Sequence, residues 1–465
     1  MAISIQNQDE AWVIDSIVKA MPPPSLSARI PRVTKILVSA KSDIYEKYYV
    51  PQVVSIGPYH YGKPKLELVE KLKPVFTKKL LARPEYEVNL SLSSLYKKLG
   101  EAKMVKELRG FYEENSTEHL SDKVFTRMML LDGCFILYYI LFIHGMTAEN
   151  CSEKVESSSD LIRSHQAVFI HHDLFLLENQ IPFIVLNEVM DLIKLDRRDK
   201  IRSFFADNIL SPGSQKSRWF CFRSGSVQSD QNSGRESHDH LLHRLHSALT
   251  GPRPKNESHW IQILSCCPKN TRKDEISTRC TFRNVSELAD VGIQFKPSNV
   301  MSLAHVEFIG GCCRWSFSAD VKLPPIIVDD STKPMLLNLI AYEMCSNDTH
   351  AWVTSYISLL DSLIDHPEDV KALRKAGVLD NSLGSDQEVA TLFNEIGTGL
   401  VPNILAYSKA KYQIQCHYQS LRNTWFSQLK HEYGRSPWSF LALLGALMAL
   451  FLSGVQTYFT IWSPS

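Results

Sequence analysis

The spacing of apolar residues along the chain predicts a mostly helical protein. Apolar residues recur every three or four positions from Leu66 onward, over 91–111 and over 121–142, as in helices that bury one face. Pro74 is expected to interrupt the first of these helices because proline lacks a backbone donor. Similar spacing predicts further helices at 333–345, 350–365, 367–376, 385–396 and 402–433.

Shorter runs predict a small β element in the C-terminal half. They cover 292–297, 304–310, 313–320 and 322–330, with turns expected at Gly310-Gly311 and at 322–325. We expect these strands to be antiparallel. The predicted fold class is therefore mainly α, with a large helical body, this β element and one C-terminal transmembrane helix.

The transmembrane helix is predicted from the last 30 residues, 436–465, which contain no charged residue. Residues 438–462 have a tryptophan at each end and, at about 1.5 Å per residue, are long enough to cross a hydrocarbon core of roughly 30 Å. The basic residues just before this span are Lys430, His431 and Arg435. By the positive-inside rule, this predicts a single-pass membrane protein whose body is cytosolic.

Small residues follow one face of this predicted span. The residues are Ala442, Ala446, Ala449 and Ser453, followed by Gln456. Such a face lets membrane helices pack closely, so self-association is one hypothesis. The alternative is that small residues are simply common in membrane spans.

The stretch 171–186, HHDLFLLENQIPFIVL, predicts two apolar helices that meet at a polar connection. Pro182 disfavours helical geometry in the residue before it, so the first helix should end near Asn179 and the second should begin at Pro182. Glu178 and its neighbours would then cap the two helix ends. The alternative is that Asp173 or Glu178 is a catalytic or ligand-binding carboxylate.

Asp132 lies inside an apolar helical stretch and therefore needs a partner if it is charged. Arg109 and Arg127 are the expected partners, which would make a buried pair between helices. The alternative is a general acid or base with a raised pKa. Asp132, Asp173 and Glu178 are thus candidate catalytic residues, although no catalytic residue is assigned.

An aromatic segment at 49–62 is the candidate binding rim. Its candidate residues are Tyr49, Tyr59, His60 and Tyr61. Segments rich in proline, glycine and aromatic residues also form ordinary packed loops, and this alternative is open.

Three histidines, His240, His243 and His246, recur at three-residue spacing and could share one side of a helix. Together they are weak candidates for a metal site, because imidazole is a good ligand for zinc and related metals. No HExxH pattern accompanies them, so a solvated histidine-rich helix is the alternative, and no metal is assigned.

Charge and motifs exclude several functions. The net charge is +1, which gives no reason to expect nucleic acid as a partner. No phosphate-binding loop or dinucleotide fingerprint is present, and no cofactor is predicted. Six N-x-S/T sequons matter only in the secretory lumen and are the observation against a cytosolic body.

These features divide the chain into five parts. They are an N-terminal leader (1–40), a helical N-terminal half (41–210), a flexible insert with the histidine-rich helix (211–258), an α+β C-terminal half (259–435) and a membrane anchor (436–465).

Several motifs, in order along the chain, resemble a known family. They are Tyr49-x-Pro51 with VSIGPYHYG, Arg109-x-x-Tyr112, MMLLDGCF at 128–135, DLFLLENQIPF at 173–183, LADVGIQF at 288–295, DDSTKPMLLNLIAYE at 329–343, and Trp425 with PW at 437–438. Together they resemble the plant domain-of-unknown-function family 247 over about residues 25 to 462. The resemblance implies a plant protein, mostly helical, with a single C-terminal span and no general assigned reaction.

The leading hypothesis is a membrane-anchored, non-enzymatic recognition or signalling protein. It would contact membrane lipid through residues 438–462 and present loops such as 49–62 and 211–236 to a protein partner whose identity is unknown. The alternative is a membrane-attached helical enzyme, lyase-like or hydrolase-like, that uses acid and base carboxylates. That enzyme would need its carboxylates to converge on an open pocket.

Overall fold

The computed structural model describes most of the folded body and the C-terminal helix. The described residues are 28–34, 42–81, 88–147, 164–193, 201, 204–205, 239–251, 283–300, 302–310, 318–346, 350–403, 405–418 and 437–462. Most of the predicted leader, the insert at 211–236 and most of the predicted strand at 313–320 lie outside these residues.

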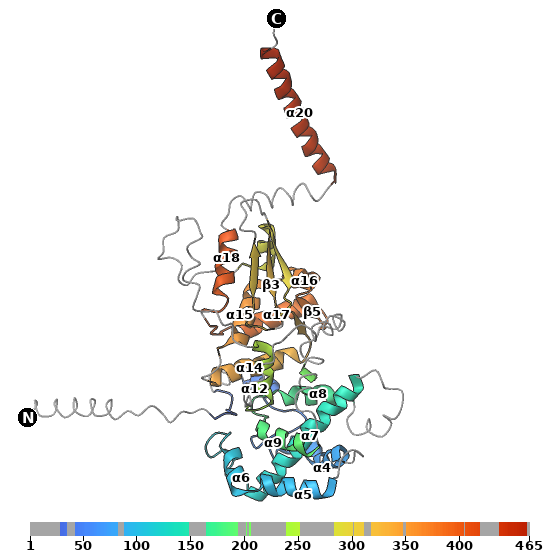
Figure 1. Cartoon of the computed structure of the whole chain (residues 1–465), viewed down its shortest axis with the longest axis vertical. Coiled ribbons are helices and arrows are strands. Elements are labelled where there is room, and N and C mark those ends of the chain that lie inside the picture. The colour runs from blue at the N-terminus through green and yellow to red at the C-terminus, as the bar shows by residue number, and fades with distance from the viewer. Residues whose placement is uncertain are drawn as a thin grey trace, which may run out of the picture.

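Helices form the N-terminal half. They are α3 (Ser42–Tyr48), the short 3₁₀ helix η1 (Pro64–Leu66), α4 (Glu67–Leu81), α5 (Val88–Leu99), α6 (Ala102–Arg109), α7 (Asp122–Thr147), α8 (Ser164–Leu174) and α9 (Phe183–Leu192). The apolar helix α7 runs through the middle of this half and packs against α4, α5 and α9 (Figure 1). The predicted helix at 91–111 is divided in two at Gly100 and Glu101.

Helix α4 continues through Pro74, so the predicted interruption is wrong. Proline removes one backbone donor, but its side chain is exposed and the residues around it are held in the core. Phe76 and Leu80 are almost fully buried beside it. Packing of this apolar face therefore outweighs the missing hydrogen bond.

The C-terminal half contains helices and two small sheets. Its elements are α12 (Leu241–Thr250), α13 (Val285–Asp290), β1 (Ile293–Pro297), β2 (Glu307–Gly310), β3 (Ala319–Leu323), β4 (Ile326–Val328), α14 (Thr332–Cys345), α15 (Trp352–Leu363), α16 (Pro367–Lys375), β5 (Leu379–Asn381), α17 (Asp386–Gly397) and α18 (Ser408–Tyr418). The expected antiparallel arrangement is corrected: β3 pairs parallel with β1 and antiparallel with β2, and β4 pairs parallel with β5. The β element is therefore mixed.

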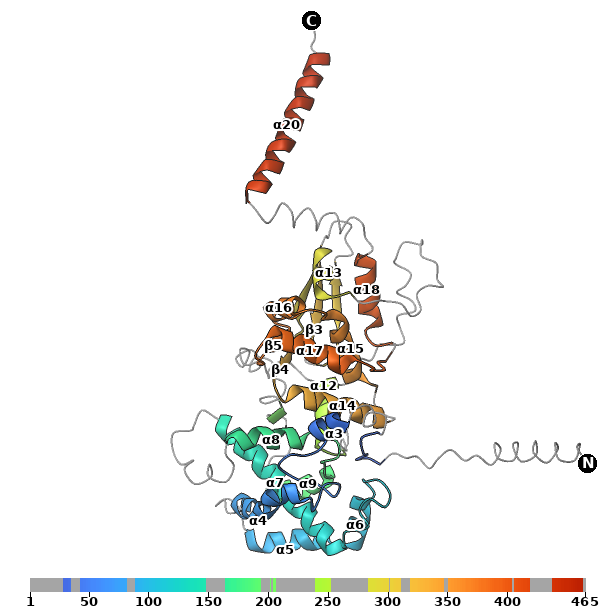
Figure 2. The same cartoon turned by 180° about the vertical axis from the view of Figure 1, so that it is seen from behind.

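The two halves form one continuous body. The side chain of Asn338 in α14 accepts a hydrogen bond from the Leu177 amide at 2.8 Å and donates one to the Tyr48 carbonyl at 2.8 Å. The Gln180 side chain accepts a bond from the Leu242 amide at 3.1 Å. One core of buried apolar residues extends through both halves, with α3, α12 and α14 between them (Figure 2).

Helix α20 (Pro437–Ile461) is 25 residues long and lies apart from the body (Figures 1 and 2). Within the described residues, one helical stretch is long and apolar enough to cross a membrane, Asp122–Ile143 of α7, and 83% of its most apolar window is buried inside the body. The apolar stretch of α20, Leu444–Tyr458, is shorter. The membrane span predicted at 438–462 therefore stays a prediction.

Candidate functional site

The connection between α8 and α9, residues 175–182, differs from the predicted helix junction. Helix α8 ends at Leu174, five residues before the predicted end, and the chain then turns with the Asn179 amide donating to the Leu176 carbonyl at 3.1 Å. Pro182 is the N-cap of α9 and lies just before the first helical residue. The side-chain amides of Asn179 and Gln180 nevertheless cap the end of α8, because they donate to the carbonyls of Asp173 and Leu174 at 2.8 Å. The capping prediction is therefore confirmed for these two residues, whereas Glu178 binds other segments.

Asp173 holds the start of the segment 51–57, which has no regular secondary structure. Its carboxylate accepts hydrogen bonds from the amides of Gln52 at 2.9 Å, Val53 at 2.7 Å and Val54 at 2.9 Å. Asp173 is fully buried. Because irregular backbone in a core cannot form ladder hydrogen bonds, side chains must take their place.

Asn179 and Asp132 hold the rest of this segment. Asn179 accepts a bond from the Ile56 amide at 2.7 Å, and Asp132 accepts one from the Gly57 amide at 2.8 Å. Gly57 has φ of 75°, and a Cβ atom there would lie 2.4 Å from the carbonyl oxygen of Gln180. Only glycine fits this close approach without displacing the connection.

Lys73 of α4 is the ion-pair partner of Asp132, so the predicted partners Arg109 and Arg127 are wrong. Its ammonium group donates to Asp132 at 2.5 Å, to Glu70 at 2.5 Å and to the Ser55 carbonyl at 2.6 Å. Arg109 instead pairs with Asp122 at 2.8 Å. These three acceptors satisfy the three N–H donors of the Lys73 ammonium group inside the body.

The pKa values of this pair follow from burial and mutual attraction. Burial, the largest cause, raises the pKa of Asp132 to about 6, and the charge of Lys73 opposes that rise. Burial alone would lower the pKa of Lys73, but the negative charges of Asp132 and Glu70 outweigh it and raise the pKa. Both groups are therefore ionised at pH 7.

Glu178 binds a different segment, residues 28–34. Its carboxylate accepts hydrogen bonds from the Val33 amide at 2.9 Å and from the Tyr45 hydroxyl at 3.0 Å. Burial, the largest cause, raises the pKa of Glu178 above its usual range, while these two bonds act in the opposite direction. Glu178 is thus a structural acceptor between three parts of the chain.

His60 lies beside Glu178 without a hydrogen bond. Its Nε2 atom is 3.7 Å from a Glu178 carboxylate oxygen, and neither ring nitrogen has a hydrogen-bond partner among the described residues. Burial, followed by the charges of Lys63 and Arg32, lowers the pKa of His60 to about 3. The ring is therefore neutral and unsatisfied, which costs stability at a buried position.

The aromatic segment lies mainly inside the body. Tyr49 and His60 are buried, and Tyr59 and Tyr61 are partly buried against the same core. The Tyr59 hydroxyl donates to the Ile30 carbonyl at 2.8 Å. Contacts inside the chain thus occupy most of the candidate binding rim.

The three histidines have separate partners. His240 is the N-cap of α12 and accepts a bond from the His243 amide at 3.2 Å, while His246 pairs with Glu343 at 2.7 Å. All three rings pack around Tyr342. Within the described residues there is no group of three or more histidine, cysteine or acidic side chains that could hold a metal ion.

Sequence reasoning missed two buried carboxylates in the C-terminal half. Glu343 accepts hydrogen bonds from the amides of Val353 at 2.9 Å and Thr354 at 2.8 Å, at the start of α15. Asp369 caps its own helix and accepts a bond from the Ser286 amide at 2.9 Å. Asp369 could have been found from its position three residues after the N-cap of α16.

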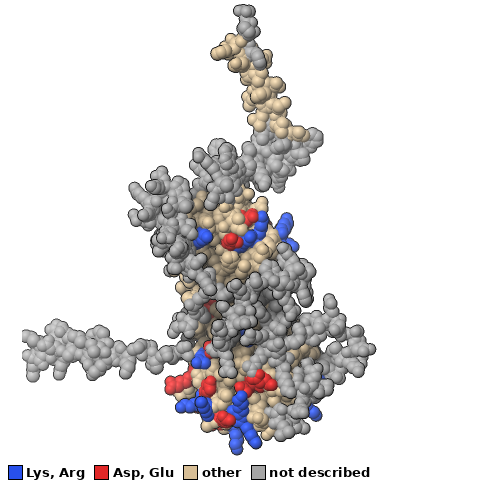
Figure 3. Space-filling view, in the orientation of Figure 1, with Lys and Arg blue, Asp and Glu red and all other residues tan. Residues whose placement is uncertain are grey.

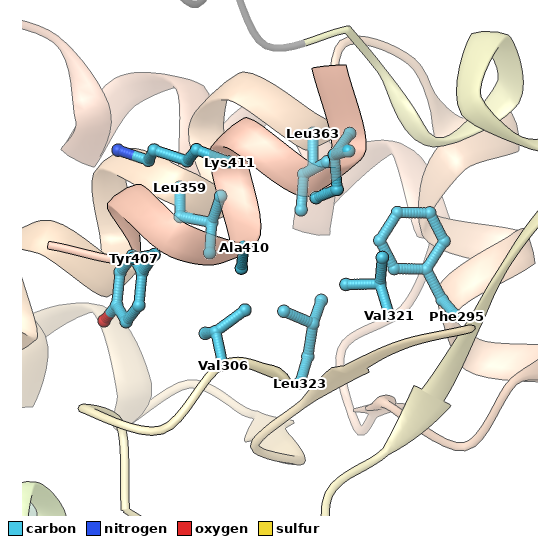
Figure 4. Close-up of a pocket in the computed structure, with 10 residues that line it drawn as sticks. Phe295, Val306, Val321, Leu323, Leu359, Leu363, Tyr407, Ala410 and Lys411 are labelled. Atoms are coloured by element: carbon cyan, nitrogen blue, oxygen red, sulfur yellow. The ribbon is translucent and has the colours of Figure 1, made fainter. Parts of the chain in front are cut away.

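A small hollow lies in the C-terminal half, between the strands β1 and β3 and the helices α15 and α18 (Figure 4). Its volume is about 10 Å³, which is the space that one water molecule needs. Val321 and Leu323 of the sheet face Leu359 of α15 and Ala410 of α18 across it. Its lining is apolar apart from Tyr407 and Lys411, and the Tyr407 hydroxyl already donates to the Leu303 carbonyl at 2.6 Å.

The candidate site is therefore a set of buried carboxylates that bind backbone amides of distant segments. Asp132, Asp173 and Glu178 face inward and do not converge on the hollow of Figure 4. The candidate packing residues Ala442, Ala446, Ala449 and Ser453 of α20 are exposed. Self-association through this face stays a prediction.

The fold and the site define a mainly helical protein whose buried carboxylates bind backbone amides inside the body. The chain belongs to the plant protein family of unknown function DUF247, whose family profile matches residues 30–452. This confirms the family resemblance of the sequence motifs.

Two Arabidopsis thaliana proteins are similar to the chain. The UPF0481 protein At3g47200 is 27% identical over 439 residues, covering 90% of this chain and 83% of the relative. The putative UPF0481 protein At3g02645 is 23% identical over 485 residues, covering 89% of this chain and 87% of the relative. No solved structure matches the chain.

Proposed function

We propose that this protein is a single-pass membrane protein whose cytosolic body binds other proteins and performs no catalysis. The observation that carries the proposal is α20, a 25-residue helix without a charged residue. Leu450 and Phe451 in its middle are 71% and 68% exposed. Such a surface is costly in water and stable in a bilayer.

The buried carboxylates favour recognition over catalysis. An enzyme that used Asp132, Asp173 and Glu178 would need to bring substrate to them, but their oxygens accept bonds from backbone amides, a tyrosine and Lys73. Opening this region would break the bonds that hold the segment 51–57. These residues therefore support the body rather than a reaction.

The surface of the N-terminal half that Figure 3 shows is typical of a protein body in water. Figure 3 shows Lys and Arg side chains interspersed with Asp and Glu, without a large area of one sign. A protein partner is therefore proposed in preference to nucleic acid, whose binding usually requires a continuous basic surface.

Alkaline extraction of membranes that contain the full-length protein tests the anchor. The wild type should stay in the membrane pellet, whereas Leu447→Arg/Leu450→Arg should move to the soluble fraction. Two arginines at the centre of a span cost about 5 to 7 kcal/mol on insertion scales. Leu447→Ala/Leu450→Ala is the matched control and should stay in the pellet. Soluble wild-type protein would reject the anchor.

Protease protection then tests the orientation. A tag before residue 28 should be cleaved in sealed microsomes if the body is cytosolic. Asn115 heads a sequon and its side chain is exposed, so a glycan there would indicate a lumenal body instead.

Proximity labelling from the same tag tests whether the body binds other proteins. The absence of any reproducible neighbour would contradict the proposed protein binding.

A further inference from the structure

Residues 28–34, which we term the N-terminal strap, are an extended segment bound to the body by side-chain and backbone contacts. The sequence is Ala-Arg-Ile-Pro-Arg-Val-Thr. Pro31 fixes its own φ and keeps Ile30 extended, so the segment is suited to lie along a surface. Ile30 and Val33 are buried, while Arg29 and Arg32 are exposed.

The surface under the strap recognises both its backbone and its charges. The Ile30 amide donates to the Phe111 carbonyl at 2.8 Å, and the Val33 amide donates to Glu178 at 2.9 Å. The Arg32 amide donates to Glu113 at 2.9 Å. We term this the strap surface, and its members are Tyr59, Phe111, Glu113, Glu178, Asp239 and Cys345.

The arginine side chains of the strap contact aromatic rings and a carboxylate of this surface. Arg29 lies over the Phe111 ring at 4.8 Å and 3.5 Å from the Asp239 carboxylate. Arg32 lies over the Tyr59 ring at 4.7 Å. The strap surface is thus built for an extended segment in which two arginines, three residues apart, are each followed by a buried apolar side chain.

Two features allow the strap to separate from the rest of the core. It forms an isolated β-bridge between Ile30 and Tyr112 and is not part of a named strand. The buried His60 ring and the Thr34 hydroxyl have no hydrogen-bond partner among the described residues while the strap is in place. Release of the strap would let water satisfy both groups, which lowers the free energy of the open state.

We propose that the strap surface is a protein-interaction site that binds an extended partner segment of the pattern Arg-apolar-x-Arg-apolar in place of the strap. The strap occupies the site within the chain, and the partner displaces it by making the same contacts. This inference rests on the proposed recognition function for its biological use, but peptide binding is measured independently of membrane anchoring.

The test is binding of a fluorescent peptide with the sequence of residues 28–34 to the full-length protein in nanodiscs. The wild type should bind weakly, because its own strap competes at high effective concentration. Ile30→Ala weakens the strap and should tighten peptide binding at least about tenfold. A peptide with aspartate at the Ile30 position should not bind.

Matched variants distinguish release of the strap from a general loss of stability of the body. Val33→Ala should also tighten binding, whereas Val401→Ala removes the same two methyl groups at a valine that is 83% exposed and should behave as wild type. Adding Glu113→Gln to Ile30→Ala removes a charge from the strap surface and should weaken the peptide. A folded Ile30→Ala protein that binds no peptide would overturn the proposal.

Hydrogen exchange on the wild type provides a second measurement that needs no variant. The Ile30 and Val33 amides should exchange faster than the amides of Ile56 and Gly57, which are bound to Asn179 and Asp132. Equal protection of the two sets would show that the strap opens only when the body unfolds, and would also overturn the proposal. Either outcome is independent of whether α20 spans a membrane.

Discussion

Helices α7 and α20 are both long and apolar, yet they have opposite surroundings. They are 26 and 25 residues long. Phe135 and Leu137 in α7 are fully buried, whereas Leu450 and Phe451 in α20 are among the most exposed apolar residues of the described chain. Length and apolarity therefore do not separate a core helix from a candidate membrane helix in this protein.

The presence of a charged residue does distinguish the two helices. Asp132 lies in the middle of α7 and has Lys73 and the Gly57 amide as partners inside the body. No charged residue occurs in α20, so its side chains need no such partner in a bilayer. A charged residue in an apolar helix thus indicates that the helix is packed inside a protein, where another side chain can pair with the charge.

Removal of the partner of Asp132 should have a large effect on stability. Lys73→Met should lower the free energy of unfolding by about 3 to 5 kcal/mol, because Asp132 is left as an uncompensated buried charge. Urea denaturation of the full-length protein, followed by tryptophan fluorescence, measures the loss.

Two control variants show whether the loss comes from the buried ion pair. Lys71→Met changes an exposed lysine of the same helix, 71% exposed and paired with Glu67, and should alter stability by less than about 0.5 kcal/mol. Lys73→Met/Asp132→Asn removes both charges and keeps an acceptor for the Gly57 amide, so it should recover much of the loss. A double variant as unstable as the sum of its parts would show that the pair does not act as a unit.

A second pair of variants tests the surroundings of each helix directly. A Cβ atom at Gly133 of α7 would lie 3.1 Å from a methyl carbon of Val185, whereas nothing lies within 4 Å of Gly445 in α20. Gly133→Leu should therefore lower the free energy of unfolding by about 1 to 3 kcal/mol through overpacking. Gly445→Leu should leave it unchanged in the same urea measurement, and equal losses would contradict the difference in environment.

Much of the helical fold could be predicted from periodicity. Helix α14 was expected at 333–345 and occupies Thr332–Cys345, and α16 was expected at 367–376 and occupies Pro367–Lys375. Helix α16 begins at a proline and has one buried face, whereas α14 is buried almost all round and begins directly after Ser331. The strand β5 was not predicted, because three residues give too short a pattern to recognise.

The core polar contacts could not be predicted in the same way, because their partners are distant in sequence. Lys73 is 59 residues from Asp132, and Asp173 is about 120 residues from the amides that it binds. One local signal was available for Lys73. It occupies the apolar face of α4 between Val69 and Phe76, where an exposed lysine would not be expected.

Titration of Asp132 should make the stability of the protein depend on pH. Its pKa is raised by burial from 3.8 to about 6, so between these values the folded state binds a proton more tightly than the unfolded state. The stabilising contribution of that proton is present below about pH 4 and is lost as the pH rises through about 6. Asn cannot titrate, so the comparison with Asp132→Asn isolates this contribution.

We therefore expect the unfolding free energy of the wild type, relative to Asp132→Asn, to fall between pH 4 and pH 7. The slope should be below about 1.4 kcal/mol per pH unit, the limit for one proton. Urea midpoints of both proteins at each pH measure it. A rising difference would mean that attraction to Lys73 dominates burial and holds Asp132 ionised in acid. In that case the protonation of Asp132 in α7 would be set by its ion pair with Lys73 and not by its burial among apolar side chains.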